Sequence, residues 1–455
     1  MRRIEIKNFG PITFAKVDIM PINILIGEQA TGKSTIAQCV HLFLSLGEDL
    51  LAEIPNINKR YIKESILNIV RSKFYAYYGS SKYLETFDIK FFYNAEEDKY
   101  IHIRPIENKT VVSFSDAFEL DRFCKELKYI LESTNLSYKQ KEINLQEEVS
   151  SFLMTKTGID VSSVKYFIAG RNITTSYSEA FKSYFSQNYR HITRLGGRNI
   201  PKSAQMELTR DFILYSAEMK DLLSAFGGSF EELFEENNTP QNFIKDFISR
   251  TVRILKGKYI ISKSGDELIK ISYGKHISLH FASSGQQESI RILQDLSLQC
   301  AFVEDAFRTI EEPEAHLFPS AQNALTELIV MTHNRTGSSF FLTTHSPYFL
   351  SSFNNLLYAA KAAGDNTQSG GYVEEDLLTK RVKKVEQLGY SKHLRLASKH
   401  FAAYQLMSDG TVEVIYNFED AITKIDGLDA VSDEIAHKFE SLVEIVKNSE
   451  HYEEA

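Results

Sequence analysis

The chain has 455 residues, 43% hydrophobic and 25% charged, an ordinary globular composition with material for about three domain units. Its 52 basic and 60 acidic residues give a net charge of −8, which argues against a protein whose whole surface wraps nucleic acid. The three cysteines, Cys39, Cys124 and Cys300, lie far apart without CxxC spacing. This excludes a disulfide framework and a cysteine-based zinc site, and it fits a reducing compartment.

The first residues contain two arginines but no apolar segment of the kind that signal peptides carry. The apolar runs along the chain are short, and none approaches the roughly 18 residues that a membrane span needs. The sequence therefore predicts a cytoplasmic protein that makes no membrane contact.

Alternating hydrophobic residues predict two strands within the first twenty residues and a third over residues 22–26. The third strand runs into the segment 27–35, which reads GEQATGKST and contains the phosphate-binding pattern GxxxxGK[ST]. Helical spacing follows from Ile36 to Leu44. A glycine turn that only caps a βα unit is the alternative, and the strand–loop–helix context argues against it. In a phosphate loop, backbone N–H groups and the helix N-terminus bind phosphate.

Further along the chain, residues 48–80 have helical spacing, and residues 87–114 have the period-two spacing of an antiparallel sheet. A charged helical region over 116–157 precedes a short apolar strand, 164–168. A mostly helical stretch follows over 176–256. Strands return at 258–262, 267–273 and 276–281, and a helix is expected from Ser289.

The span 180–206 has no acidic residue, although it contains five basic residues interleaved with four aromatic ones. This pattern fits a DNA-contacting surface on which bases stack. A solvated basic face with aromatic side chains packed beneath it is the alternative, and it is the more common explanation of such a charge run.

An apolar segment ends in the acidic pair Glu311 and Glu312, followed by Pro313. Neighbouring side chains of a strand face opposite sides, so one carboxylate can meet a metal ion while the other meets the attacking water. A solvated acidic turn is the alternative, and the phosphate loop argues against it. The buried strand 340–344 then leads to His345. The tail predicts a hairpin over 400–416 and a final helix with Ile435 and Val446 on one face.

The segment 283–287, SSGQQ, resembles the signature loop of the ABC-type ATPases, and His345 resembles their switch histidine. The stretch 311–319, EEPEAHLFP, and the opening 4–12 are similar to the branch that holds chromosome-maintenance, recombination-repair and overcoming-lysogenization-defect ATPases. The resemblance covers residues 1–40, 160–175 and 255–350.

This resemblance implies roles for individual residues. Glu312 would be the catalytic base, and His345 would sense the γ-phosphate. Glu311 stands where the family usually has an aspartate on the metal side, and the added methylene implies slow hydrolysis. Arg171 is similar to the arginine of the family's PAER segment. The residues expected to bind ATP are Gly27, Glu28, Gln29, Ala30, Thr31, Gly32, Lys33, Ser34 and Thr35, together with Ser284, Gly285 and Gln286 from a second subunit; Ser34 and Glu311 are expected to bind Mg²⁺.

The resemblance predicts an α/β fold: an ABC-type P-loop ATPase core with added antiparallel strands, a helical insertion and a small C-terminal hairpin-plus-helix unit. We expect one half of the core over residues 1–175, the insertion over 176–256, the other half over 257–385, and the C-terminal unit over 386–455.

Residues 346–455 lack the DxD motif of a Toprim nuclease, so we expect the chain to have no nuclease centre of its own. Its size and its tail, with Tyr404, Asp409 and Leu442, resemble the ATPase subunit of the Septu anti-phage system, which pairs with an HNH nuclease. The ATPase of the PARIS system, with a Toprim partner, is one alternative. A genome-maintenance ATPase of the recombination-repair type and a scaffold that binds ATP without turnover are others. A homo-oligomer with a partner nuclease is expected.

Overall fold

The computed structural model describes most of the chain. The residues described are 1–53, 57–79, 86–107, 109–133, 147–151, 153–155, 157–159, 163–176, 203–272, 274–365 and 375–423. Most of the basic span 180–206 and the whole of the predicted final helix lie outside these residues.

A six-stranded sheet forms the centre of the molecule, with strand order β14-β13-β3-β12-β11-β7. All its pairings are parallel except that between β13 and the edge strand β14. The apolar runs of the central strands β3, β11 and β12 are buried on both faces, as is usual in parallel sheets. The strands are β3 (Ile22–Gly27), β7 (Ser163–Phe167), β11 (Ala306–Glu311), β12 (Ser339–Thr344), β13 (Phe401–Leu406) and β14 (Val412–Val414).

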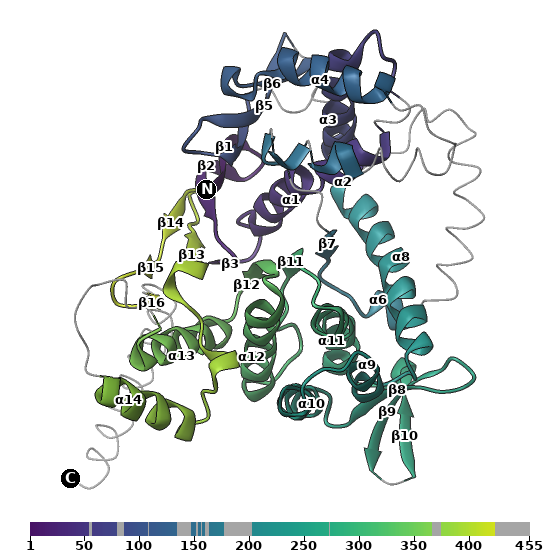
Figure 1. Ribbon diagram of the computed structural model, residues 1–455, viewed down its shortest axis with the longest axis vertical. Helices are drawn as coiled ribbons and strands as arrows, with labels where there is room; N and C mark the ends of the chain where they lie inside the picture. The colour runs from purple at the N-terminus through teal and green to yellow at the C-terminus, as the bar shows by residue number, and fades with distance from the viewer. Residues whose placement is uncertain are drawn as a thin grey trace, which may run out of the picture.

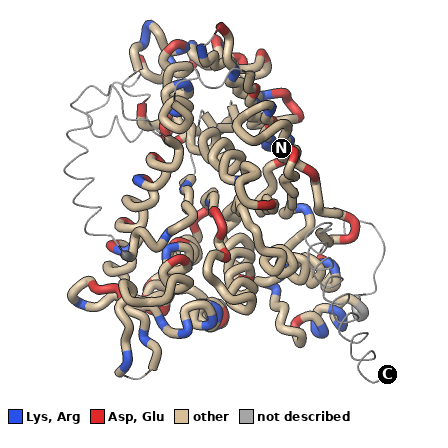
Figure 2. Tube along the Cα trace, turned by 180° about the vertical axis from the view of Figure 1, so that it is seen from behind, with Lys and Arg blue, Asp and Glu red and all other residues tan. Residues whose placement is uncertain are grey.

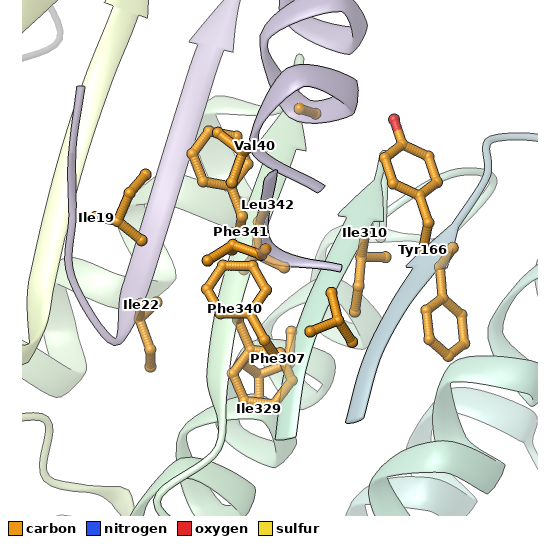
Figure 3. Close-up of a cluster of buried hydrophobic side chains, with 14 of the residues drawn as sticks. Ile19, Ile22, Val40, Tyr166, Phe307, Ile310, Ile329, Phe340, Phe341 and Leu342 are labelled. Atoms are coloured by element: carbon orange, nitrogen blue, oxygen red, sulfur yellow. The ribbon is translucent and has the colours of Figure 1, made fainter. Parts of the chain in front are cut away.

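Helices cover this sheet and close its core. Figure 3 shows Val40 of α1 (Lys33–Leu44) and Ile329 of α12 (Pro319–Thr336) converging on side chains of β11 and β12. These residues are fully buried, as are Phe340 and Leu342 between them. Burial of such side chains stabilises the fold by roughly 1.5–3 kcal/mol each.

The parallel register brings the ends of four strands to one edge of the sheet. Thr344 of β12 pairs with Ile26 of β3, and Glu311 of β11 pairs with Thr343. The segments that follow β3, β7, β11 and β12 therefore emerge side by side, where parallel sheets place their ligand sites.

A second, antiparallel sheet has the order β2-β1-β4-β5-β6. The strands predicted over 87–114 are confirmed, and they join the two predicted at the start of the chain. This sheet packs with α3 and α4 in the upper part of Figure 1. The elements are β1 (Arg2–Phe9), β2 (Ile12–Ile19), α2 (Leu46–Glu53), α3 (Ile62–Tyr78), β4 (Asp88–Asn94), β5 (Lys99–Ile106), β6 (Lys109–Phe114) and α4 (Leu120–Ser133).

The described part of the predicted insertion, residues 203–256, is helical, and the three strands predicted after it form a small sheet of order β10-β9-β8. The hairpin predicted in the tail is β13 and β14, and β13 also continues the core sheet beside β3. The remaining elements are α6 (Ile173–Ser176), α8 (Ala204–Ala225), α9 (Phe230–Glu236), α10 (Gln241–Leu255), β8 (Lys258–Ile261), β9 (Glu267–Ser272), β10 (Lys275–Ser278), α11 (Ser284–Phe302), α13 (Pro347–Ala363), α14 (Glu375–Gln387), β15 (Tyr416–Asn417) and β16 (Ile422–Thr423).

The structure thus has the predicted α/β architecture, a mostly parallel core sheet with added antiparallel strands; the domain boundaries at residues 175, 256 and 385 stay a prediction. Acidic and basic residues are interspersed along the trace, in keeping with the composition (Figure 2). None of the helices in the described part of the chain is both long and apolar enough to cross a membrane.

One predicted boundary was wrong: α11 begins at Ser284, not at Ser289. The Ser283 hydroxyl accepts a hydrogen bond from the Gln286 N–H, and the Gln286 side chain accepts one from the Ser283 N–H. This capping box starts the helix one turn before its hydrophobic spacing begins. The signature residues therefore form the first turn of the helix.

Candidate functional site

The loop between β3 and α1 is shaped by two glycines. Gly32 has φ +114°, and a Cβ there would lie 2.6 Å from Ile12 Cδ1. A Cβ on Gly27 would lie 2.6 Å from the carbonyl oxygen of Leu406, on the neighbouring strand β13. A larger residue at position 27 would therefore require a shift of the β13 backbone, and at position 32 the positive φ disfavours any residue with a side chain.

Lys33 begins α1, and its side chain folds back over the loop. Its Nζ donates to the carbonyl oxygens of Gly27, at 2.8 Å, and Glu28, at 2.5 Å. Burial lowers the pKa of Lys33 to about 8, and the nearby Glu312, Glu314 and Glu28 oppose this shift. Ser34 is exposed beside it in the first turn of α1.

Lys33, His345 and Glu312 form a short chain of polar contacts at the edge of the sheet. Lys33 Nζ lies 3.3 Å from His345 Nδ1, and His345 Nε2 lies 3.2 Å from Glu312 Oε1. Since an ammonium can only donate, Nδ1 accepts and the proton of the neutral ring sits on Nε2. Burial and the Lys33 charge lower the pKa of His345, which supports the neutral form.

Glu312 has a strained backbone. Its φ of +41° lies in the left-handed region, which is unfavourable for a residue with a side chain. Its N–H donates to the Thr343 carbonyl oxygen at 2.9 Å, and its own carbonyl oxygen accepts from Arg171. These two hydrogen bonds hold the strained backbone in place, and the carboxylate lies just past the end of β11, half-exposed and facing His345.

Glu311, by contrast, is buried and faces β7. Its Oε1 accepts from the Tyr166 hydroxyl at 2.7 Å, and its Oε2 accepts from the Ala169 N–H at 3.0 Å. Gln38 of α1 reaches the same Tyr166 hydroxyl, so the Glu311 carboxylate lies on the side of the sheet that α1 covers. The two acidic residues therefore face different partners, as their position at a strand end predicts.

The oxygen atoms of Ser34 and Glu311 suit Mg²⁺, which prefers hard oxygen ligands. Ser34 offers an exposed hydroxyl on α1. Each oxygen of Glu311 accepts one hydrogen bond and keeps a lone pair.

A third carboxylate, Glu314, supports the histidine. Its Oε1 accepts from the Thr344 hydroxyl at 2.5 Å and from the His345 N–H at 3.0 Å. Burial raises the pKa of Glu314. The side chain thus holds the end of β12, and with it His345, against the turn that follows the acidic pair.

The signature residues lie beside this same turn. A Cβ on Gly285 would lie 2.6 Å from the carbonyl oxygen of His316, so the start of α11 touches the segment after the acidic pair. Ser284 is exposed. The Gln286 side chain is occupied by the capping box and by the Leu255 carbonyl oxygen, to which its Nε2 donates at 2.6 Å.

The structure therefore brings Lys33, His345 and Glu312 together. Within the described part of the chain, no hydrogen bond joins residues 27–35 to residues 283–286. Sequence reasoning missed Tyr166 and Glu314. The signal that could have found Glu314 is a further carboxylate two residues after the acidic pair, in a segment otherwise rich in apolar residues.

Comparisons with known proteins give one family match and several distant structural likenesses. No curated protein matched the chain. The Smc head domain of Pyrococcus furiosus with an extended coiled coil, bound to the C-terminal domain of ScpA, is 12% identical with a TM-score of 0.39, over 96% of this chain and 100% of that one. The recombination mediator RecF is 12% identical with a TM-score of 0.33, over 91% and 97%. The Smc head domain of Thermotoga maritima is 9% identical with a TM-score of 0.33, over 77% and 90%. The profile of the AAA ATPase domain family matches residues 1–350, and the chain belongs to that family.

Proposed function

We propose that the chain binds ATP with Mg²⁺, hydrolyses it slowly, and does so as an ABC-type ATPase whose sites are completed by a second copy. The observation that carries this proposal is the convergence of Lys33, His345 and Glu312 at the edge where β3, β11 and β12 end. A cation for phosphate, a carboxylate for proton transfer and a neutral histidine between them suit phosphoryl transfer to water.

The hydrogen bonds between Lys33, His345 and Glu312 suggest how these groups respond to ATP. Lys33 donates to its own loop and to His345, and His345 donates to Glu312. A triphosphate offers Lys33 stronger acceptors than carbonyl oxygens, since hydrogen bonds between charged groups are the strong ones. His345 can then donate to the γ-phosphate, which leaves Glu312 to accept the proton of the attacking water. Ser34 and Glu311 would hold Mg²⁺, which when bound neutralises charge on the phosphates.

ATP binding is expected to take up a proton near pH 8. The pKa of Lys33 is about 8, and a bound triphosphate would favour the ammonium form and raise this pKa. Affinity should therefore weaken as the pH rises above about 8, by up to roughly tenfold per unit.

Calorimetry between pH 7.5 and 9.5, in buffers of different ionisation enthalpy, measures this uptake. The Lys33→Arg variant is the control, since its side chain stays protonated throughout. No uptake by the wild type, or equal uptake by Lys33→Arg, would contradict the assignment.

The proposed partner of the nucleotide site is the signature of a second copy. Ser284 lies exposed at the N-terminus of α11, which attracts anions. Phe281, three residues before it, is 81% exposed, and Phe318, which follows the His316–Leu317 segment that Gly285 contacts, is 78% exposed. Exposed aromatics of this size are typical of association surfaces.

We expect ATP to promote a dimer or a larger even-numbered oligomer, and Ser284→Arg to prevent it because the larger side chain fills the space for the phosphate. Light scattering with ATP, with ADP and without nucleotide measures the mass. Ser264→Arg, in the exposed turn between β8 and β9, is the matched control. A wild type that stays monomeric in all three conditions would exclude the shared site.

For the cellular role, we propose an anti-phage defence complex in which the nucleotide state controls a partner nuclease of HNH type, as in Septu. The support is the resemblance in size and in the tail. Co-expression with nuclease genes found beside the gene for this chain, followed by phage challenge, tests the role. Protection that needs both an HNH partner and Lys33 supports it. A Toprim partner indicates a PARIS-like system, and ATPase activity that DNA stimulates without a partner indicates recombination repair.

A further inference from the structure

Arg171 lies in the turn that follows β7, and its side chain is fully buried (0% exposed). Every nitrogen of its guanidinium donates to a backbone carbonyl. Nη1 donates to Ile168 and Glu311, Nη2 donates to Glu312 at 2.8 Å, and Nε donates to Glu288 at 3.0 Å. One side chain therefore joins the end of β7, the acidic pair after β11 and the second turn of α11.

The link to α11 is double. The Glu288 carboxylate accepts from the backbone N–H of Arg171 at 2.9 Å and also lies 3.5 Å from its Nε. One turn further along α11, Arg291 Nε donates to the Thr174 hydroxyl at 3.0 Å. The turn after β7 is thus fastened to the helix that begins with the signature residues.

This arrangement is better explained by a requirement to fix the relative positions of the carbonyl groups that Arg171 joins than by a contribution to the stability of the fold. A buried ion pair contributes little more than well-packed apolar side chains would, because both charges lose their hydration. The guanidinium has a rigid, planar set of donors, which fixes the relative positions of the acceptors it joins. One acceptor is the carbonyl of Glu312, whose strained backbone needs an external constraint.

We propose that Arg171 is a positioning residue that couples the signature helix to the acidic pair of the same subunit. This inference rests on the proposed ATPase function. When the start of α11 meets the nucleotide of a second copy, a displacement of the helix moves Glu288. Arg171 then carries that movement to the Glu312 carbonyl and so sets the orientation of the base. Each subunit's base thereby responds to the nucleotide that its signature touches, not only to its own.

The chain contains a matched comparison in Arg308. Arg308 is also fully buried and also joins α11 to β11, through hydrogen bonds of 3.0 Å to Asp295 and through donation to the Ser163 carbonyl. It lies in the middle of β11 and touches neither member of the acidic pair. Replacing Arg308 therefore perturbs the same helix and strand but leaves the hydrogen bond between Arg171 and Glu312 in place.

The test compares Arg171→Lys with Arg308→Lys in the full-length protein. Lysine keeps the charge, but its ammonium has only three N–H donors on one nitrogen, so it cannot reproduce the four hydrogen bonds that the planar guanidinium donates from three nitrogens. We expect Arg171→Lys to lower kcat about 10- to 100-fold with KM within about threefold, since a small misplacement of a catalytic group has effects of this size. We expect Arg308→Lys to lower Tm but to leave kcat per folded molecule within about threefold. Glu288→Gln weakens the same link from the helix side and should follow Arg171→Lys, so it decides the matter if Arg171→Lys fails to fold.

Hydrogen exchange gives a second readout that a merely structural role would not change. In a Glu312→Gln background, ATP should protect both the phosphate loop and residues 311–317. In the double variant that also carries Arg171→Lys, ATP should still protect the phosphate loop but should no longer protect residues 311–317. An unaltered kcat in both Arg171→Lys and Glu288→Gln overturns the proposal, as does an equal loss of kcat in Arg308→Lys. A wild type that neither binds nor hydrolyses ATP instead refutes the proposed function itself.

Discussion

Replacing Lys33 by alanine is expected to abolish measurable ATP binding. The Lys33 ammonium donates to two carbonyl oxygens at the centre of the loop, and a bound triphosphate would replace these acceptors. Hydrogen bonds to charged groups contribute about 1.5–3 kcal/mol each, so losing two weakens binding by roughly 100-fold or more. Calorimetry or a fluorescent ATP analogue measures the affinity.

Lys73→Ala is the control for this variant. Lys73 is a mostly buried lysine of α3 that pairs with Asp49, away from the phosphate loop. Its loss should cost stability but leave ATP affinity within about twofold of the wild type. If Lys33→Ala binds ATP as tightly as Lys73→Ala does, the loop is not the phosphate site.

Replacing Glu312 by glutamine is expected to trap ATP. The amide keeps the shape of the side chain but cannot take a proton from water, and general-base catalysis typically contributes 10²–10⁴-fold. We therefore expect kcat to fall at least about 100-fold while the affinity for ATP changes little. Single-turnover hydrolysis of radiolabelled ATP, with bound nucleotide identified after gel filtration, measures both quantities.

Glu304→Gln is the control for this variant. It makes the same chemical change at an exposed glutamate two residues before the start of β11. Its turnover should match that of the wild type. Equal turnover by Glu312→Gln and Glu304→Gln would show that another group acts as the base; Glu314 would be the next candidate, since it lies in the same turn.

The sequence was sufficient to predict the fold class and the strand–loop–helix arrangement around residues 27–33. Apolar strands that are buried on both faces leave continuous hydrophobic runs, and Gly27 and Gly32 follow one of them at the spacing that a phosphate loop requires. The position of Glu312 at a strand end was predictable for the same reason.

The contacts that organise the site were not predictable, because they join residues that are distant in sequence. Tyr166 reaches Glu311 across 145 positions, and Arg171 reaches Glu288 across 117. Periodicity describes neighbours along one element and carries no information about which elements meet. The start of α11 was missed for a different reason: the capping box lies in polar residues that precede the hydrophobic spacing.

The close approach of Leu406 to Gly27 has a consequence for the order in which the protein becomes functional. The strand beside the phosphate loop, β13, is synthesised after residues 27–35, 283–287, 311–312 and 345, and the Tyr404 hydroxyl donates to the backbone carbonyl of Asp18, 386 positions away. During translation, all the nucleotide motifs are therefore synthesised before β13 is available to pack against the phosphate loop. A premature stop codon between 346 and 400 would leave every motif intact, yet it should behave genetically as a complete loss of the gene.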